Sequence, residues 1–201
     1  ADTPDKIVIR NVTIEGLRNK STTGSVEGIH IFASNPIDGV DIDNVTIRDI
    51  RQPVWGADGI KIQAGVSNVS ISNATIENIH GLWSYGIVTT PSSNLALGVP
   101  TGVLITDSTI RDISSELTNS SIAVGIDSAS GSKTNTGVAP AHETEVHDSS
   151  FVNVSFGVYN KDTGNVTNAT SNYWGAESGP SGAGSGAGVA VSENVTFRPF
   201  L

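Results

Sequence analysis

The chain has 201 residues, a formal net charge of −9 at pH 7 and no cysteine or methionine. This acidic balance disfavours a nucleic-acid partner, because no basic stripe is present to neutralise phosphates. The length suits one elongated domain, no apolar run is long enough for membrane insertion, and disulfides play no part in stability. Because strand patterning already begins at Ile7 without an initiator Met, we expect a processed or excised product.

One pattern recurs six times: a β-type segment reaches Asn or Asp, turns, and begins another β-type segment. The six segments are VIRNVTIEGL, DIDNVTIRDI, SISNATIENI, LITDSTIRDI, EVHDSSFVNV and a degenerate NVTNATSNYW. Their turn residues, which we expect to stack as a ladder, are Asn11, Asn44, Asn73, Asp107, Asp148 and Asn168. Separations of roughly 20 to 40 residues are typical of a solenoid. Asn tolerates a left-handed turn, and stacked amides can hydrogen-bond along the tube.

A further apolar segment opened by glycine lies between successive turns, so each coil holds three short strands. The coil from Gly59 to Tyr85 alternates apolar and polar residues on all three faces. Read across the coils, one interior stack consists of Ile14, Ile47, Ile76, Ile110 and Phe151, and an outward row of alternating charge consists of Glu15, Arg48, Glu77 and Arg111. Crossovers between parallel strands are right-handed in nearly all cases. We therefore predict an all-β, right-handed parallel β-helix of about five or six three-strand coils.

The two ends of the chain differ. Residues 1–174 carry the coils, whereas residues 175–201 form a Gly/Ser-rich segment that ends in a strand-like VTF and an aromatic terminus. We interpret this tail as a cap in which Trp174, Phe197 and Phe200 cover the last coil. Only ADTPDK precedes the first strand, so we expect the first coil to be uncapped. End-to-end stacking into rods or fibres is one hypothesis, and a fragment of a longer chain is the other.

The NVTIRDI-type units, together with the terminal NYWG, SGP and FRPFL elements, extend over nearly all residues. In these elements the chain resembles the broad family of right-handed parallel β-helix repeat proteins, and its tail is similar to those of secreted archaeal and bacterial members. That family includes polysaccharide lyases, glycoside hydrolases, adhesins and phage tailspikes. The resemblance therefore implies the fold and leaves the activity open.

In polysaccharide-acting members of that family the working groups project from one face, here the face of the glycine-opened segments. Its outward residues are His30, Phe32, Lys61, Gln63, Val88, Asp127, Tyr159 and Lys161, which form no obvious acid and base set. Asp58 in GADGIKI resembles the Asp of the NTDGxDI element of polygalacturonase-like hydrolases, but Gly56, Ala57 and Lys61 depart from that element. The paired carboxylates of inverting hydrolysis are therefore missing. A lyase would use Lys61 as base beside calcium.

Three aromatic residues lie in loops just before strands of this face. Trp55, Trp83 and Tyr85, beside His30 and Lys61, are the candidate ligand-binding residues, because aromatic faces suit sugar rings. The alternative is that these side chains fold inward and seal gaps between coils.

We expect no cofactor, and two places are candidates for a metal. Asp41 and Asp43 are a candidate calcium site, against which stands a simple charge pair with Arg10. In HETEVH, at 142–147, Glu143, Glu145 and His147 share one face of a strand and form a weak candidate metal site. The alternative is a solvated polar strand.

Ten sequons occur, and four of them belong to the turn row. The other six, near loops or strand edges, are glycosylation candidates: Asn19, Asn68, Asn119, Asn153, Asn165 and Asn194. They favour a secreted or cell-surface location. We predict a structural or adhesive extracellular module, more consistent with a non-enzyme, whose partner is a second copy or an extracellular glycan. The alternative is a carbohydrate-binding or polysaccharide-degrading β-helix.

Overall fold

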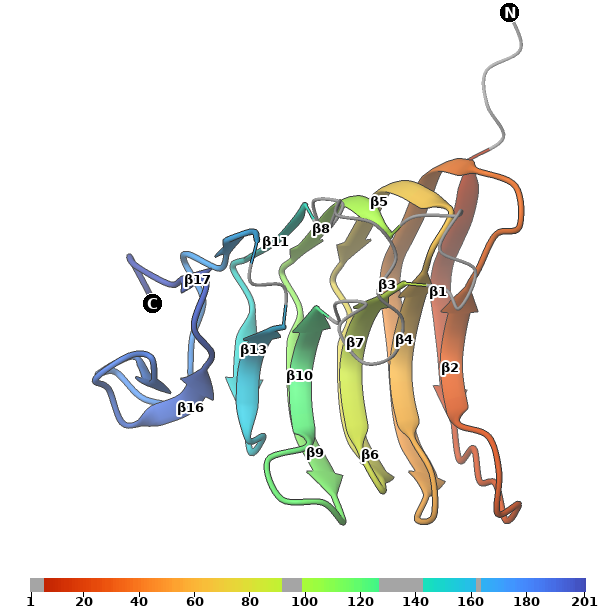
Figure 1. The fold of residues 1–201 in the computed structure, drawn as a ribbon, viewed down its shortest axis with the longest axis horizontal. Coiled ribbons are helices and arrows are strands. Elements are labelled where there is room, and N and C mark those ends of the chain that lie inside the picture. The colour runs from red at the N-terminus through yellow and green to blue at the C-terminus, as the bar shows by residue number, and fades with distance from the viewer. Residues whose placement is uncertain (1–5, 92–98, 127–142, 162–163) are drawn as a thin grey trace, which may run out of the picture.

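The computed structural model describes residues 6–91, 99–126, 143–161 and 164–201. Within these ranges the chain is all β, without a helix, and its parallel strands wind into a solenoid of about five turns (Figure 1). The predicted parallel β-helix is confirmed. In the same ranges no helix is long and apolar enough to cross a membrane.

Sheet A has ten strands and covers two faces of the tube, because β3 (Ile37–Gln52) bends and takes part in both faces. β1 (Ile7–Glu15) pairs with β3 at the N-terminal end. On one face β3 is followed by β5 (Val66–Ser72), β8 (Thr101–Thr106), β11 (Thr144–His147), β14 (Thr167–Asn168) and β17 (Val195–Thr196). On the other face it is followed by β6 (Thr75–Gly81), β9 (Thr109–Ser115) and β12 (Ser150–Val152).

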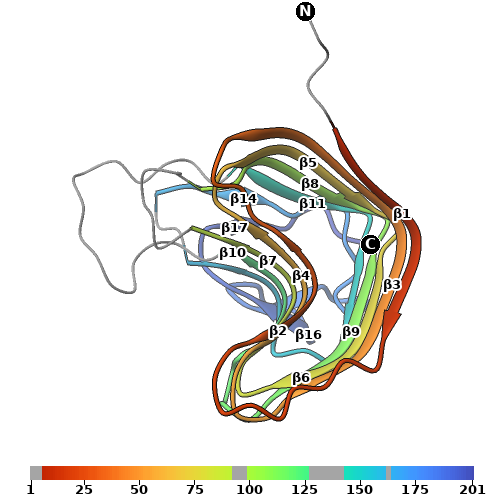
Figure 2. The same cartoon turned by 90° about the vertical axis from the view of Figure 1, so that its right-hand side faces the viewer.

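Sheet B has seven strands and forms the third face. In order from the N-terminal end they are β2 (Val26–Ile31), β4 (Ala57–Gln63), β7 (Ser84–Thr90), β10 (Ser121–Ile126), β13 (Phe156–Asn160), β16 (Gly188–Val191) and β15 (Pro180–Gly182). Viewed along the tube, this face curves toward the interior, so its outer surface is concave (Figure 2).

Isoleucine stacks form the core. The register joins the residues of the predicted interior stack coil by coil, and all of them except half-buried Ile14 are fully buried. On the outside, Arg48 donates to Glu15 at 2.6 Å and Arg111 donates to Glu77 at 2.5 Å. The alternating charge row therefore forms ion pairs between neighbouring coils.

A row of left-handed residues turns the chain between the two faces of sheet A. Five residues of the predicted ladder have φ between 50° and 55°: Asn11, Asn44, Asn73, Asp107 and Asp148. Asn168 does not belong to this row. The register aligns it with Glu145 in β11, which lies three residues before the turn residue Asp148. Ser171, with φ of 61°, takes the turn position, and its carbonyl accepts the N–H of Asp148.

A second left-handed row, which was not predicted, lies five residues after the first. Its members Asp49, Asn78, Asp112 and Asn153 have φ between 53° and 59°. The Nδ2 of Asn153 donates to the Oδ1 of Asp112 at 2.8 Å, and Asn78 donates likewise to Asp49. Side-chain amides and carboxylates thus connect successive coils at this corner as well.

A row of small residues explains the inward curve of sheet B. Gly28, Gly59, Gly86, Ala123 and Gly157 stack at one register position. A Cβ on Gly59 would lie 2.7 Å from Ile76 Cγ2, and one on Gly86 would lie 2.4 Å from Ile110 Cγ2. Because real Cβ atoms do not approach so closely, glycine lets sheet B press against the isoleucine stack of sheet A.

Residues 175–201 cover the C-terminal end. Trp174 is fully buried, with its ring 5.2 Å from that of Phe151. Phe200 packs over Gly179, where a Cβ would meet its ring at 2.5 Å, and the Arg198 guanidinium lies over the same ring at 5.4 Å. The tail therefore packs half-buried Phe197 and Phe200 at this end, with the exposed Arg198 over both rings.

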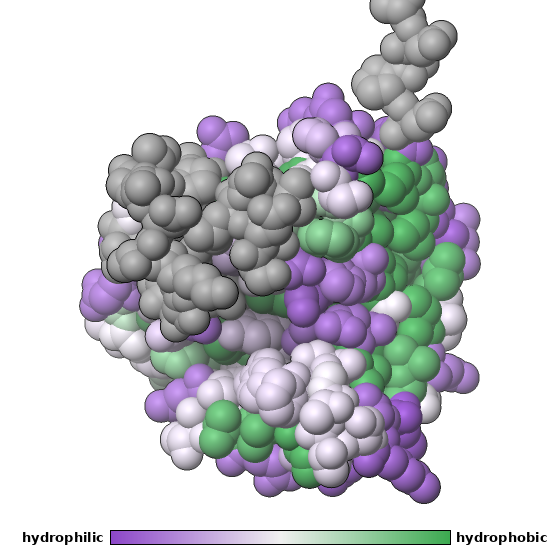
Figure 3. Space-filling model, turned by 45° about the vertical axis from the view of Figure 1, so that its right-hand side comes forward, coloured by the Kyte–Doolittle hydropathy of each residue, from purple (hydrophilic) through white to green (hydrophobic). Residues whose placement is uncertain are grey.

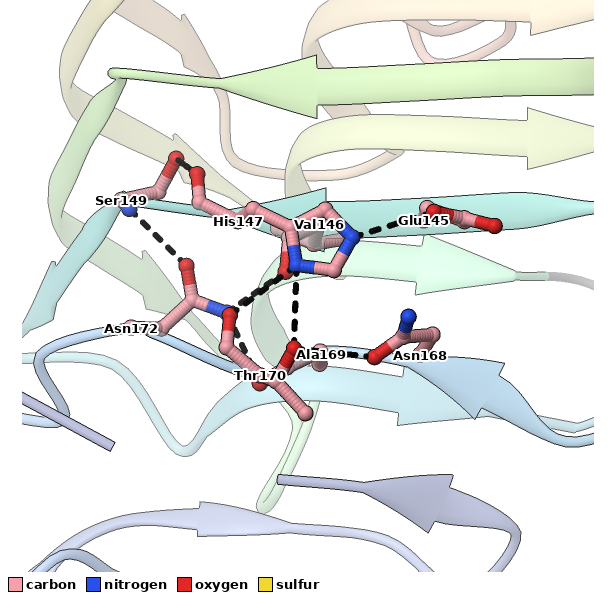
Figure 4. A network of polar contacts seen from close by, with 8 residues as sticks. All are labelled: Glu145, Val146, His147, Ser149, Asn168, Ala169, Thr170 and Asn172. Carbon is pink, nitrogen blue, oxygen red and sulfur yellow. Dashed lines mark hydrogen bonds and ion pairs between the residues drawn. The ribbon is translucent and has the colours of Figure 1, made fainter. Parts of the chain in front are cut away.

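A buried polar ladder leads into the covered end. The Oγ of Ser108 accepts the N–H of Ala74, and the Oγ of Ser149 accepts the N–H of Ser108, both at 3.1 Å. Asn172 completes the ladder: its Oδ1 accepts the N–H of Ser149 at 2.9 Å, while its Nδ2 donates to the carbonyl of Val146 at 2.7 Å (Figure 4). These side chains connect coils just after the left-handed turn.

Candidate functional site

The concave outer face of sheet B contains a groove of about 500 Å³. Strands β4, β7, β10 and β13 supply most of its lining, so the groove runs across consecutive coils. Its described lining residues are Ser25, Asp58, Lys61, Trp83, Tyr85, Val88, Thr90, Asn119, Ser120, Ile122, Tyr159 and Lys161. The mixture of aromatic rings, hydroxyls, an amide and two lysines is typical of a site for a polar, ring-containing ligand.

Tyr85 lies across the neighbouring strand β10. A Cβ on Gly125 would be 2.5 Å from a carbon of the Tyr85 ring, so only glycine at this outward position leaves room for the ring. Beyond Gly125, the Nζ of Lys161 donates to the Tyr85 hydroxyl at 3.3 Å and lies 6.0 Å from the ring centroid. Three successive strands thus place one aromatic ring and one cation together in the groove.

Tyr159 follows Gly125 in the register of β10 and β13. Its ring meets that of Phe156 edge to face, with the centroids 4.7 Å apart. Such a contact fixes the orientation of a half-buried ring. The Tyr85 ring therefore lies over Gly125, and Tyr159 is the next outward residue at that register position.

Two tryptophans lie at the border of the groove. The rings of Trp55 and Trp83 are 5.2 Å apart, and Trp83 covers Gly56, where a Cβ would lie 2.4 Å from its Nε1. Trp83 lines the groove, whereas Trp55 is outside the lining and is 39% exposed. The two rings are neither sealed inside the tube nor both in the groove.

The N-terminal part of the groove is charged. Asp58 is nearly buried on β4, and its register partner on β2 is Glu27. Lys61 donates to Glu27 at 3.3 Å, and the side chains of this pair are only about one-fifth exposed. The charges of Lys61 and Glu27 therefore offset each other, and the hydroxyl-rich remainder of the groove carries Asp58 and Lys161.

No protein-family model, curated protein or solved structure matches this chain. The family resemblance of the sequence thus stays an expectation.

The structure brings three of the five predicted ligand-binding residues together: Lys61, Trp83 and Tyr85. Trp55 contacts Trp83 from outside the lining. Exposed His30 is hydrogen-bonded to Gln63 Oε1 at 3.0 Å and is also outside the lining. Tyr159 and Lys161 were recognised as outward residues but not as part of the site. Their place in the groove follows from the strand register. Only the pairing of the strands shows that Gly125 leaves room for Tyr85 to meet Lys161. Asp127 lies outside the described residues.

The candidate calcium ligands have other contacts. Asp41 accepts from Arg10 and from Lys6, the latter at 3.3 Å, and the hydrogen bond from Arg10 is the main cause of its lowered pKa. Asp43 accepts from Asn73 and Ser72 at 2.9 Å, and these bonds lower its pKa in turn. The carboxylates therefore connect coils. Among the described residues no group of three or more His, Asp or Glu side chains has metal-binding geometry.

In HETEVH, His147 belongs to the polar network of Figure 4. Its Nε2 is 3.1 Å from Glu145 Oε2, and its Nδ1 is 3.1 Å from the carbonyl oxygen of Thr170. Glu143 is exposed just before β11, and His142 lies outside the described residues. The imidazole thus joins β11 to the next coil.

The six glycosylation candidates differ in exposure. Asn68, Asn119 and Asn153 are exposed, while Asn19, Asn165 and Asn194 are half-buried. Asn68 donates to Asp38 Oδ1 at 2.5 Å and has left-handed φ, as does Asn153. These two asparagines therefore have a structural place in turns as well as an accessible side chain.

Proposed function

We propose that this chain is a carbohydrate-binding β-helix that holds an extended polysaccharide in the groove of sheet B, as an adhesive module at a secreted or cell-surface location. The observation that carries the proposal is the pair of tyrosines in the groove: the ring of Tyr85 lies over Gly125, and Tyr159 is the next outward residue at that register position. Aromatic rings of this kind offer stacking faces to sugar units, and the nearby amide and hydroxyls offer hydrogen bonds. Exposed sequons support the location.

We propose binding without turnover. Asp58 is the one carboxylate among the described lining residues, whereas inverting and retaining hydrolysis both use two. Lys61, the candidate base of a lyase, is ion-paired with Glu27. Incubation with each bound polysaccharide should release neither reducing ends nor unsaturated products, and release of either would make the module an enzyme.

Affinity electrophoresis tests the binding directly. The chain is run through gels that contain a neutral xylan, a neutral mixed-linkage glucan or a polyuronate, and retardation is compared with a gel without polysaccharide. At least one polysaccharide should retard the wild type, and Tyr85→Ala and Tyr159→Ala should each weaken binding roughly tenfold. Tyr173→Ala is the matched control, because Tyr173 is an exposed tyrosine paired with Ser150 in sheet A.

Gly125→Ala makes the test specific for the geometry. The added methyl group would displace the Tyr85 ring, so binding should weaken although every side chain of the site is still present. In the double variant with Tyr85→Ala, the glycine substitution should have no further effect. Wild-type affinity in all three groove variants, or no retardation by any polysaccharide, would contradict the proposal.

A further inference from the structure

The N-terminal end of the solenoid presents an edge of sheet A. β1 pairs only with β3 among the described strands, so half of its backbone N–H and C=O groups face away from the tube. Four apolar side chains of β1 point inward yet are only half-buried: Ile7, Ile9, Val12 and Ile14. Hydrophobic side chains gather at this end of the surface (Figure 3). We call β1 together with Lys6 the open edge.

We propose that the open edge pairs with the open edge of a second copy, about a two-fold axis perpendicular to the tube. A two-fold axis makes the paired strands antiparallel, and residues directly opposite each other then point to the same face. This surface is separate from the groove, so the inference does not depend on the proposed function.

The bend of β1 selects one register. The left-handed Asn11 divides the inward residues into Ile7 and Ile9 before the bend and Val12 and Ile14 after it. The two parts of β1, before and after the bend, both have inward residues facing inward residues only if the dyad lies between Arg10 and Asn11. In that register Ile7 faces Ile14 of the second copy, and Ile9 faces Val12. Because the dyad coincides with the corner, it exchanges the two arms and maps the bent strand onto itself.

Charges along the open edge fit the same register. Lys6 comes opposite Glu15 of the second copy, in addition to the contacts that these side chains make with Asp41 and Arg48 of their own chain, and by symmetry this pairing occurs twice. Arg10 comes opposite Asn11, and Asp41 of the same chain offsets the charge of each Arg10 beside the dyad. Opposite charges in directly facing positions stabilise strand pairs, and like charges destabilise them.

The covered C-terminal end limits the assembly to two copies. A rod would need the open edge of one copy to meet the opposite end of the next. At that end Trp174 is buried and Arg198 lies over Phe197 and Phe200, so an apolar edge finds no matching surface there. Pairing of the open edge with itself leaves no second open edge of this kind for a further copy.

Sedimentation equilibrium over a broad concentration series tests the pairing. The mass should rise from 20.8 kDa toward twice that value and stop there. Glu15→Lys places lysines opposite each other and should weaken the dimer about tenfold, while Lys6→Glu combined with Glu15→Lys should restore it. Glu77→Lys is the matched control, because it removes the equivalent contact with Arg111 on an inner coil.

Each other outcome overturns the proposal. A chain that stays at 20.8 kDa at every concentration has no pairing edge. A mass that grows beyond two copies requires head-to-tail stacking. A dimer that responds equally to Glu15→Lys and Glu77→Lys, or that is not restored by the charge exchange, uses another surface or register.

Discussion

Trp174 is fully buried at the C-terminal end of the solenoid, whereas Ile9 and Ile14 of β1 stay half exposed at the N-terminal end. The inner position after the turn also differs. It is Val12 and Val45 in the first two coils, but Ser108, Ser149 and Asn172 near the covered end, where each side chain accepts a backbone N–H. A repeat protein can therefore combine one end held by aromatic packing and a polar ladder with another whose edge is left for a partner.

The largest effect should come from opening the covered end. Trp174→Ala removes a fully buried ring that packs on Phe151 and Gly157, so the free energy of unfolding should fall by about 3 to 5 kcal/mol. Ile9→Ala in the half-exposed first coil should cost less than half of that. Urea unfolding of the two variants in dilute solution measures both values. An equal loss would mean that the two ends are held alike.

Breaking the polar ladder should have the next largest effect. Asn172→Ala leaves the N–H of Ser149 and the carbonyl of Val146 buried without their partner, which should cost about 2 to 3 kcal/mol. Asn168→Ala is the control, since the side chain of Asn168 is only half-buried and accepts from Thr170; we expect about 0.5 kcal/mol or less. A reversed order would show that Asn168 holds the turn position predicted from the sequence.

The comparison of Asn172 with Asn168 shows which turn residues could be predicted from the sequence and which could not. The isoleucine stack and the first five turn residues followed from period-two patterning and a regular Asn or Asp. The prediction was wrong for the turn residue of the sixth coil. Asn165 and Asn168 both begin NxT motifs there, whereas the turn residue in the structure is Ser171. The second turn row follows the first at a constant offset of five residues, so the sequence contains its signal as well.

The groove was only partly predictable. Aromatic residues before strands of sheet B indicated Trp83 and Tyr85, because their position in the repeat is a property of the sequence. The contact between Tyr85 and Lys161 depends on strand pairing across 76 residues and on the missing side chain at Gly125. The pattern of glycine-opened segments also gave a wrong position in one coil. There Ala123, and not Gly125, belongs to the inward row of small residues.

The inward row of small residues in sheet B allows a glycine-to-alanine substitution to be compared between an inner coil and the edge of the sheet. In Gly86→Ala the new Cβ would lie 2.4 Å from Ile110 and 2.7 Å from the Ala123 carbonyl oxygen, with strands on both sides. Overpacking of this kind costs about 1 to 3 kcal/mol. Gly28→Ala meets similar distances on β2, but β2 is an edge strand and can shift, so its loss should be clearly smaller. Thermal and urea unfolding of the pair should agree, and equal losses would mean that β2 is as constrained as β7.

Acid should produce the smallest difference between the two ends, and it should weaken the N-terminal half. Hydrogen bonds from Arg10 to Asp41 and from Asn73 and Ser72 to Asp43 hold the pKa of these carboxyls below the ordinary value of about 3.9. Because the folded pKa is lower than the unfolded one, their contribution to stability is present above about pH 4 and is lost as the pH falls through the folded pKa. Urea unfolding between neutral pH and about pH 3 should therefore show a loss of stability that is smaller in Asp41→Asn, whose side chain cannot titrate. Arg10 loses the negative charge of Asp41 in that variant at every pH, so its stability should already be lower at neutral pH. An Asp41→Asn chain with the full acid dependence of the wild type would place the titrating groups elsewhere, and the first coils would then owe their stability to the isoleucine stack rather than to the carboxylates that connect them.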